Sequence, residues 1–392
     1  MKTAFLTAEE AAAELNVSRA TLYAYVSRGL IRSEPRAHSR KRLYRAEDVR
    51  RLIDGRVREP GGDRASRASL PVLESAITDI GPQGFRYRGR EVAGLAQAAS
   101  LETVAGLVWS ASEDPFAGPP PIWSAPVVDL CASLATADPL VRAQALLPVI
   151  GAEDRTALNR SPAGLADTGA QLLRSLTAVI IGSTPKQDAV HAQLAAVWPT
   201  ADAALLRAAL VVSADHELNA STFAARVVTS TGASLYAGVT AGLAALGGPR
   251  HGGMTDRVAA LLPALLDAPD AEQAIAERLG RGDPLPGFGH PIYPEGDPRA
   301  PILIDLMRPH FTGQPRFDQA LDIARAATEL AASPPTIDFA LTLMAIMLDL
   351  PPRAPLCLFA IGRAVGWIGH AMEQIADGGL IRPRARYVGL HP

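Results

Sequence analysis

Three of the eight histidines in the chain lie in segments whose composition is typical of binding sites. They are His216 in ADHELNAST, His251 in GGPRHGGM and His290 in GFGHPIYPEGDPRA. Glycines surround the second and third. Glycine lets the backbone approach a ligand closely and opens helix termini, where N–H groups can face an anion. The pattern therefore indicates a site for an anionic ligand.

Two other interpretations of these histidines are a metal site and a purely structural role. His216 and Glu217 begin like the zinc-binding helix motif, but Ala220 occupies the position where that motif needs a second histidine. No spacing of Asp or Glu supports a metal ion shared by the three histidines, so no metal is expected. Each histidine alone could equally be a satisfied core or helix-end residue.

The elements that position these residues are expected to be mainly helical. Of 392 residues, 48% are apolar and 5% are aromatic, and alanine dominates, which favours helices packed by small side chains. A chain of this length predicts two or three domains. Two cysteines are too few for a disulfide framework or a thiolate metal site.

The sequence also predicts a soluble, cytoplasmic protein. No secretion signal is visible in MKTAFLTAEEAAAEL. The apolar run FALTLMAIML ends well short of the roughly 20 residues that span a bilayer, so no membrane segment is expected. The first 60 residues hold 13 Lys or Arg against 8 Asp or Glu, and the other 332 hold 25 against 32. An acidic partner is therefore expected at the N-terminal segment alone.

A helix-turn-helix is predicted in this basic segment. Thr7 and Glu10 form a capping box ahead of a helix over 8–15, and Ser18 caps a second helix over 19–28. A third helix begins near Ala46, and the basic residues before it are interpreted as a wing that touches phosphates. Beyond this unit, residues 58–69 are rich in Gly, Ser and Arg and are predicted to be a linker.

The segments TAEEAAAELNVSRATLYAYVSRGLI and RLYRAEDVRRLI resemble the winged helix-turn-helix of MerR-type regulators and excisionase-like proteins. The likeness covers about residues 1–56. The alternative is a helical appendage that only packs on the rest of the protein, because function does not follow from fold. If the unit binds DNA, the candidate contacts are Arg19, Tyr23, Arg40, Lys41 and Arg42.

The rest of the chain resembles citrate synthase. The likeness is carried by ADHELNASTFAARVVTSTGASLYAGVTAGLAALGGPRHGG, PGFGHPIYPEGDPRAP, PTIDFAL, LFAIGRAVGWIGHAMEQ and IRPRARYVG, in the family's order and at about its spacing. The resemblance implies a mainly α, two-domain fold. A large helical domain is expected over 70–253 and 349–392 and a small one over 254–348, with a cleft between them. The helix-turn-helix domain (1–57) and the linker (58–69) precede them.

The resemblance implies a role for each polar residue. Asp338 would take a proton from the methyl group of acetyl-CoA while His251 donates a hydrogen bond to the thioester oxygen. His290 would polarise the ketone of oxaloacetate. The residues expected to hold oxaloacetate and citrate are His216, Arg299, Arg363 and Arg382, the last of them reaching across a homodimer. Those expected at coenzyme A are Gly287, Gly289 and Pro291.

The chemistry needs these residue types for reasons of its own. A proton beside a thioester is too weakly acidic for a carboxylate to remove unless a preorganised donor meets the developing oxyanion. A dicarboxylate is matched by guanidinium forks, whose paired N–H groups fit carboxylate geometry better than a lysine does. Closure of two domains would hold both substrates in a dry site.

Several residues keep ordinary structural alternatives. Asp338 could simply cap a helix, Arg363 could pair on the surface, and Arg382 could belong to a charged tail. The chain also departs from the family pattern, because Met254 and Thr255 follow the His251 glycines and Pro294 stands where Lys or Arg often meets coenzyme A phosphates. Another basic residue, such as Arg281, is expected to replace this contact with coenzyme A.

Two classes of function follow. The first is an enzyme that condenses acetyl-CoA with oxaloacetate and hydrolyses the product to citrate and CoA, with propionyl-CoA and 2-methylcitrate synthesis as a variant. It needs no permanently bound cofactor, only the coenzyme A thioester as co-substrate. The second is a DNA-binding regulator whose citrate synthase-like body senses a metabolite.

Overall fold

The computed structural model of the protein describes residues 5–15, 22, 26, 31–35, 42–46, 48–49, 73–81, 84–290, 293, 295–383, 385, 387 and 389. The chain divides into two compact units, an N-terminal unit (Met1–Val72) and a body (Leu73–Pro392). The predicted linker over 58–69 lies outside the described residues.

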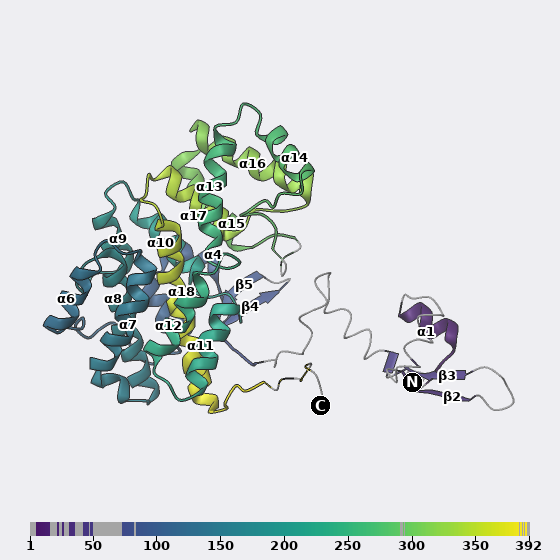
Figure 1. Ribbon diagram of the computed structural model, residues 1–392, viewed down its shortest axis with the longest axis horizontal. Helices are drawn as coiled ribbons and strands as arrows, with labels where there is room; N and C mark the ends of the chain where they lie inside the picture. Colours follow the sequence, from purple (N-terminus) through teal and green to yellow (C-terminus); the bar gives the residue numbers. More distant parts are fainter. Residues whose placement is uncertain are drawn as a thin grey trace. The chain divides into compact units, whose positions relative to one another are not determined.

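The N-terminal unit contains a helix and a three-stranded sheet (Figure 1). Helix α1 (Ala8–Glu14) begins at the predicted capping box, where Thr7 Oγ1 accepts the Glu10 N–H and Glu10 Oε2 accepts the Thr7 N–H. The antiparallel strand order is β1 (Phe5–Leu6), β3 (Arg42–Arg45), β2 (Ser33–Pro35), and β2 and β3 flank the predicted wing.

The rest of the predicted helix-turn-helix is described only at isolated positions. Leu22 and Val26 are helical, Leu22 is fully buried, and Val26 packs against the apolar cluster that contains Leu15 and Leu22. Ala46 is helical, as the predicted third helix requires.

The body is built almost entirely of helices (Figure 1). Prolines lie inside three of them, at Pro148, Pro263 and Pro309, so not every proline marks a break between helices. The helices are α4 (Val92–Ala98), α5 (Leu101–Val108), α6 (Ala125–Ser133), α7 (Pro139–Glu153), η1 (Arg155–Leu158, 3-10), α8 (Pro162–Ile181), α9 (Val190–Val197), α10 (Ala203–Ser213), α11 (Ala220–Ser230), α12 (Leu235–Leu246), α13 (Met254–Leu266), α14 (Ala271–Gly280), α15 (Arg299–Phe311), α16 (Pro315–Ala331), α17 (Ile337–Met347) and α18 (Ala354–Asp377).

A small antiparallel meander opens the body. It consists of β4 (Thr78–Gly81), β5 (Gly84–Tyr87) and β6 (Arg90–Glu91). Tyr87 is fully buried, and its hydroxyl oxygen lies 3.1–3.3 Å from the carbonyl oxygens of three residues at and beyond the end of α10, namely Val211, Val212 and Asp215. The sheet is thereby tied to the segment that carries His216.

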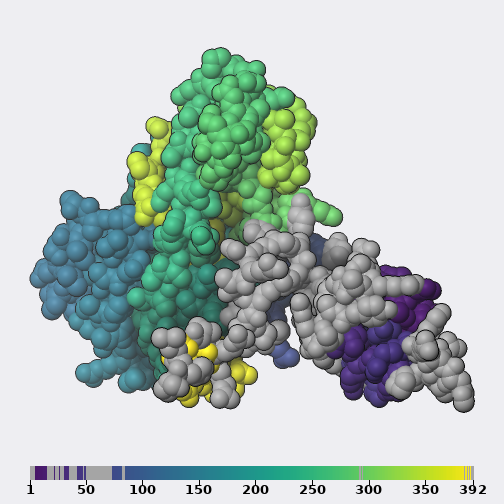
Figure 2. Space-filling model, turned by 45° about the vertical axis from the view of Figure 1, so that its right-hand side comes forward, coloured from purple at the N-terminus to yellow at the C-terminus, as the bar shows by residue number. Residues whose placement is uncertain are grey.

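Helix α18 is the central helix of the body and packs against α8, α10, α11 and α12 (Figure 1). It is long and apolar enough to cross a membrane, yet 94% of its most apolar window is buried inside the body. Glycines permit the close packing, because a Cβ at Gly362 would lie 2.6 Å from the Leu210 carbonyl oxygen. The chain from α13 to α16, coloured green, stands out as a lobe at the top of the body (Figure 2). It falls within the predicted small domain, whose exact boundaries stay a prediction.

Candidate active site

A cavity of about 600 Å³ gathers the predicted polar residues from distant parts of the body. Its walls come from the segment between α10 and α11, the start of α13, the loop before α15, the first turn of α17, and α18. The predicted residues that line it are His216, His251, Gly287, Gly289, His290, Arg299, Asp338 and Arg363.

His216 is buried, lines the cavity and lies outside any helix, which excludes the zinc-helix interpretation. Its Nε2 atom is hydrogen-bonded to the hydroxyl of Tyr293, and its ring lies edge-on to the ring of His290, with centroids 5.7 Å apart. Burial, followed by the charges of Arg299 and Arg363, lowers the pKa of His216 well below its usual value. Burial and Arg299 also lower the pKa of His290. Both rings are therefore neutral at pH 7 and suited to hydrogen bonding.

His251 is held by a chain of hydrogen bonds that starts in α18. Trp367 Nε1 donates to Ser221 Oγ at 3.0 Å, and Ser221 Oγ lies 2.7 Å from His251 Nε2. Ser221 Oγ also donates to Asn219 Oδ1 at 2.8 Å, and that oxygen accepts the backbone N–H groups of Ser221 and Thr222 as well. A turn of the Ser221 hydroxyl toward His251 Nε2 would place the imidazole proton on Nδ1, the tautomer in which Nδ1 can donate a hydrogen bond into the cavity. Burial lowers the pKa of His251 to about 4, so this ring is neutral too.

Asp338 occupies the first turn of α17 and does not cap it. Thr336 is the N-cap residue, and its hydroxyl lies 3.3 Å from Asp338 Oδ2. The other carboxylate oxygen, Oδ1, is buried and has no hydrogen-bond partner among the described residues. Burial raises the pKa of Asp338 to about 6, and the nearby charge of Arg299 only partly offsets this effect. An ionised carboxylate with a raised pKa is a stronger base than an ordinary one.

The two predicted arginines that line the cavity differ in what they offer a ligand. Arg299 is engaged, because its Nε and Nη2 atoms donate to the two oxygens of Asp297 at 2.9 and 2.7 Å. Arg363 is fully buried and donates only Nε–H, to the Ser213 carbonyl oxygen at 2.9 Å. Its Nη1 and Nη2 atoms have no partner among the described residues. A buried guanidinium with two nitrogens left to donate is suited to bind a carboxylate. The alternative prediction, that Arg363 pairs on the surface, is wrong.

The glycine loop beside the cavity is shaped by its backbone. Gly287 has φ +86°, and a Cβ there would meet Val258 Cγ2 at 2.8 Å. Its carbonyl oxygen accepts the backbone N–H of Thr336 at 2.9 Å, and Gly289 N–H donates to the Pro334 carbonyl oxygen at 2.8 Å. The loop is thereby fastened to the start of α17. The predicted coenzyme A contact Pro291 lies outside the described residues.

The rim of the cavity carries two cations that sequence reasoning missed, Arg250 and Arg257. Arg281, which was expected to compensate for Pro294, is not among the described residues that line the cavity and pairs with Asp283 at 3.1 Å. Met254 lines the cavity as expected, whereas Thr255 is buried and donates its hydroxyl to the Gly252 carbonyl oxygen. Pro294 itself lies outside the described residues.

Two groups of predicted residues are not part of this cavity. Arg382 is exposed in the segment after α18, next to the bond from Ile381 N–H to Ser230 Oγ, and is not among the described lining residues. Four of the predicted DNA contacts lie outside the described residues: Arg19, Tyr23, Arg40 and Lys41. The fifth, Arg42, is exposed, and its guanidinium donates to the side chain and carbonyl of Ser33.

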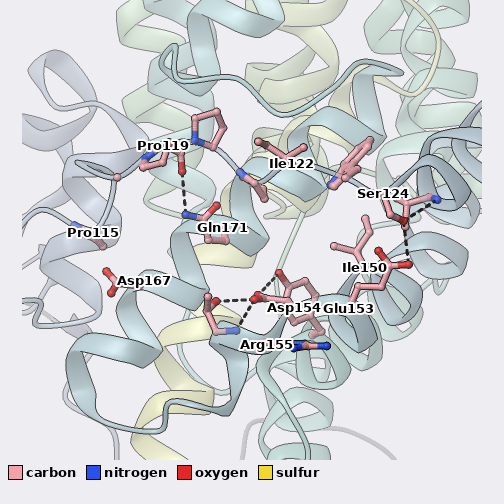
Figure 3. Close-up of a pocket in the computed structure, with 17 residues that line it drawn as sticks. Pro115, Pro119, Ile122, Ser124, Ile150, Glu153, Asp154, Arg155, Asp167 and Gln171 are labelled. Carbon is pink, nitrogen blue, oxygen red and sulfur yellow. Dashed lines mark hydrogen bonds between the residues drawn. The ribbon is translucent and has the colours of Figure 1, made fainter.

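A second cavity, of about 790 Å³, contains none of the predicted residues (Figure 3). Its carboxylates serve local structure, because Asp154 accepts the hydroxyl of Tyr236 and the N–H of Thr156, and Glu153 accepts the hydroxyl of Ser124 (Figure 3). Gln171 Nε2 donates to the Pro119 carbonyl oxygen (Figure 3). The smaller cavity, with its neutral histidines and unpaired groups, is therefore the candidate active site.

Comparison with known proteins assigns the body to a family. The family model described as "Citrate synthase, C-terminal domain" matches residues 126–384, and the model described as "Helix-turn-helix domain" matches residues 5–57. Citrate synthase 2 of Bacillus subtilis is 38% identical over 184 residues, which are 46% of this chain and 50% of that protein. The 2-methylcitrate synthase of Mycobacterium tuberculosis is 31% identical over 358 residues, 82% of this chain and 89% of that protein.

Solved structures agree with this assignment. The crystal structure of citrate synthase from Pyrobaculum aerophilum superimposes with a TM-score of 0.71 at 25% identity, covering 82% of this chain and 91% of that one. The predicted fold, a two-domain helical citrate synthase fold behind a small helix-turn-helix domain, is confirmed. The chain belongs to the citrate synthase family and carries a helix-turn-helix domain ahead of its citrate synthase body.

Proposed function

We propose that this protein condenses a short acyl-CoA, acetyl-CoA in the first place, with oxaloacetate and hydrolyses the product to release CoA. The observation that carries the proposal is the pairing of two unsatisfied groups in one cavity. Arg363 presents two unpaired guanidinium nitrogens, and Asp338 presents an unpaired carboxylate oxygen of raised basicity. The first suits a substrate carboxylate, and the second suits a weakly acidic C–H bond.

The cavity residues then act in a fixed order. Asp338 takes a proton from the methyl carbon of the thioester while His251, protonated on Nδ1, hydrogen-bonds the oxygen that becomes enolate. The enolate carbon attacks the ketone of oxaloacetate, forming a carbon–carbon bond, and His290 donates a hydrogen bond to the oxygen that becomes alkoxide. The alkoxide takes up a proton to become the hydroxyl of the condensed thioester, and water then attacks the thioester carbonyl, which breaks the carbon–sulfur bond and gives citrate and CoA. Neutral imidazoles serve as such donors, and a preorganised donor is typically worth about 3 to 4 kcal/mol of transition-state stabilisation.

The choice of acyl group is a finer question, because the relatives include both a citrate synthase and a 2-methylcitrate synthase. We propose acetyl-CoA as the preferred substrate, with propionyl-CoA as the competing one. Thiol release measured with each thioester and oxaloacetate decides between them. Arg250 and Arg257 at the rim are the proposed partners of the coenzyme phosphates, which replacement of both by Gln tests as a rise in KM for the thioester.

We further propose a cytoplasmic homodimer in which Arg382 of one copy enters the cavity of the other. Arg382 is exposed and outside the cavity of its own chain. An apolar groove between α7 and α12 supports a helical interface, and its lining includes Gly151, Ala152, Ala237 and Ala241. The second carboxylate of the substrate needs another arginine, because Nε and Nη2 of Arg299 already donate to Asp297.

A second role, binding of duplex DNA by the N-terminal unit, is favoured by the helix-turn-helix match. The excess of basic residues over residues 1–60 supports it. Two cations beside the wing are used internally, since Arg32 forks onto Asp48 and Arg45 pairs with Glu34. We therefore expect salt-sensitive DNA binding that is lost when Arg40, Lys41 and Arg42 are replaced. Binding that ignores both salt and these changes would favour a packing role instead.

A further inference from the structure

A buried carboxylate that the proposed mechanism does not use lies directly behind the cavity. Asp215 precedes His216, is fully buried, and is not among the described residues that line the cavity. Its Oδ1 atom has no hydrogen-bond partner among them. A Cβ added at Gly366 would come within 2.2 Å of this oxygen, so the carboxylate packs directly against the backbone of α18.

The other carboxylate oxygen, Oδ2, is held from two sides. The Thr78 hydroxyl of β4 donates to it, and His370 Nε2 of α18 lies 3.3 Å away. Beyond His370, Glu373 Oε2 lies 3.9 Å from Nδ1. Although burial alone would raise it, His370, Arg363 and Thr78 hold the pKa of Asp215 below its usual value. Asp215 is therefore a fixed negative charge at neutral pH.

The same face of α18 presents a positive charge to the cavity. Arg363, Gly366 and His370 are spaced three and four residues apart, so they share one side of the helix. Among the described residues no carboxylate forms an ion pair with Arg363, although its guanidinium is fully buried. Burial lowers the pKa of Arg363 to about 10, and Asp215 is the largest influence that opposes this effect. A buried, unpaired cation is costly unless an opposite charge lies nearby.

We propose that Asp215 is the internal counter-ion of the cavity, stabilising the buried Arg363 guanidinium while the cavity is empty and weakening the binding of the substrate carboxylate that later pairs with it. The inference rests on the proposed function in one respect, namely that the ligand is a dicarboxylate. Asp215 is a positioning residue and touches no reacting atom. The Asp215 charge attracts Arg363 in both the empty and the liganded protein, but it also repels the substrate carboxylate, so it stabilises the empty protein and weakens ligand binding.

Asp215→Asn is the direct test, because asparagine keeps the shape and an acceptor for Thr78 and His370 but removes the charge. The expected result is a lower Tm of the empty protein together with several-fold tighter binding of oxaloacetate and of citrate by calorimetry. Thr78→Val is the matched control, since it removes a donor and leaves the charge, and it should lower Tm without tightening binding. Asp48→Asn, which removes a buried ion-paired carboxylate of the N-terminal unit, should leave both affinities unchanged.

A double-variant cycle tests the inference without any ligand. In an Arg363→Met background the Asp215→Asn change should cost much less Tm than in the wild type, and a non-folding Asp215→Asn protein should fold again as the double variant. Weaker oxaloacetate binding in Asp215→Asn, or an equal Tm cost in both backgrounds, overturns the inference. If thioester turnover is absent but the coupling is present, the proposed function fails and the counter-ion stands.

Discussion

At the scale of single residues, Asp338 combines a functional gain with a structural cost. Its pKa is raised from 3.8 to about 6 by burial, so the folded state resists ionisation of this group more than the unfolded state does. As the pH rises from 3.8 to about 6, ionisation of Asp338 lowers the free energy of unfolding, and above that range the loss of stability is constant. Catalysis at neutral pH therefore uses a carboxylate that destabilises the fold.

Replacing Asp338 by Asn should separate these two effects. Thiol release should fall by about 10²- to 10⁴-fold, because the general base is lost. The Tm should rise at pH 8, and the gain should shrink as the pH falls from 6 toward 4, since the wild-type carboxylate then becomes protonated. Scanning calorimetry at several pH values measures this, and a Tm difference independent of pH would contradict the assignment of the raised pKa to this residue.

The pH profile of the wild-type protein provides another test. Asp338 must be ionised to accept a proton, so kcat/KM should be flat above about pH 6 and fall tenfold per unit below it. His251, with its pKa lowered to about 4, stays neutral through this range and therefore causes no further change in kcat/KM with pH. An activity that falls only below pH 4 would rule out the raised pKa of the base.

The candidate catalytic and binding residues could be predicted from the sequence, whereas the residues that hold them by hydrogen bonds could not. Histidines and arginines in glycine- and proline-rich segments stand out in any sequence, whereas a serine such as Ser221 does not. The partner that fixes its role, Trp367, lies 146 positions away, so only the fold reveals the contact. The Asp297–Arg299 pair, two residues apart, was the one support within reach of sequence reasoning.

At the scale of elements, the first turn of α11 positions the thioester site. Asn219 caps this helix by accepting the N–H groups of Ser221 and Thr222, and Ser221 then contacts His251. Asn219→Ala should cost about 1 kcal/mol of stability, as for other N-caps, and should also lower kcat. Asp270→Ala, which removes the N-cap of α14, is the matched control and should cost stability alone. An unchanged kcat in Asn219→Ala would show that the cap does not hold the site.

Helix ends were predictable where local chemistry decides them and unclear where tertiary contacts do. The capping box of α1 appeared as predicted because its two hydrogen bonds are local. At α17 two polar residues compete for the cap, and the choice of Thr336 depends on its contacts with Gly287, 49 positions earlier. The strands β4 and β6 are held by pairing with β5, a contact that the sequence alone does not show.

At the scale of the whole molecule, the proposed dimer can be tested by mixing two inactive variants. Asp338→Asn and Arg382→Met each disable a site. If Arg382 acts across the interface, a mixed dimer regains one complete site, and random pairing restores about a quarter of wild-type activity. If Arg382 acts within its own chain, every site stays defective and mixing restores nothing.

The order of motifs along the chain predicted the family, because the motifs are local and their order survives substitution. The domain boundaries and the partner of Arg382 could not be obtained in the same way. They depend on which surfaces meet, and small apolar residues such as those lining the groove between α7 and α12 look alike whether they face a helix or a second copy.

The proposed condensation is tested most directly by thiol release from acetyl-CoA in the presence of oxaloacetate, measured with wild-type protein and with Asp338→Ala. Turnover by the wild type should require both substrates, and it should be lost in the variant while oxaloacetate still binds. A folded wild-type protein that binds oxaloacetate but releases no thiol from acetyl-CoA or propionyl-CoA would contradict the proposed condensation.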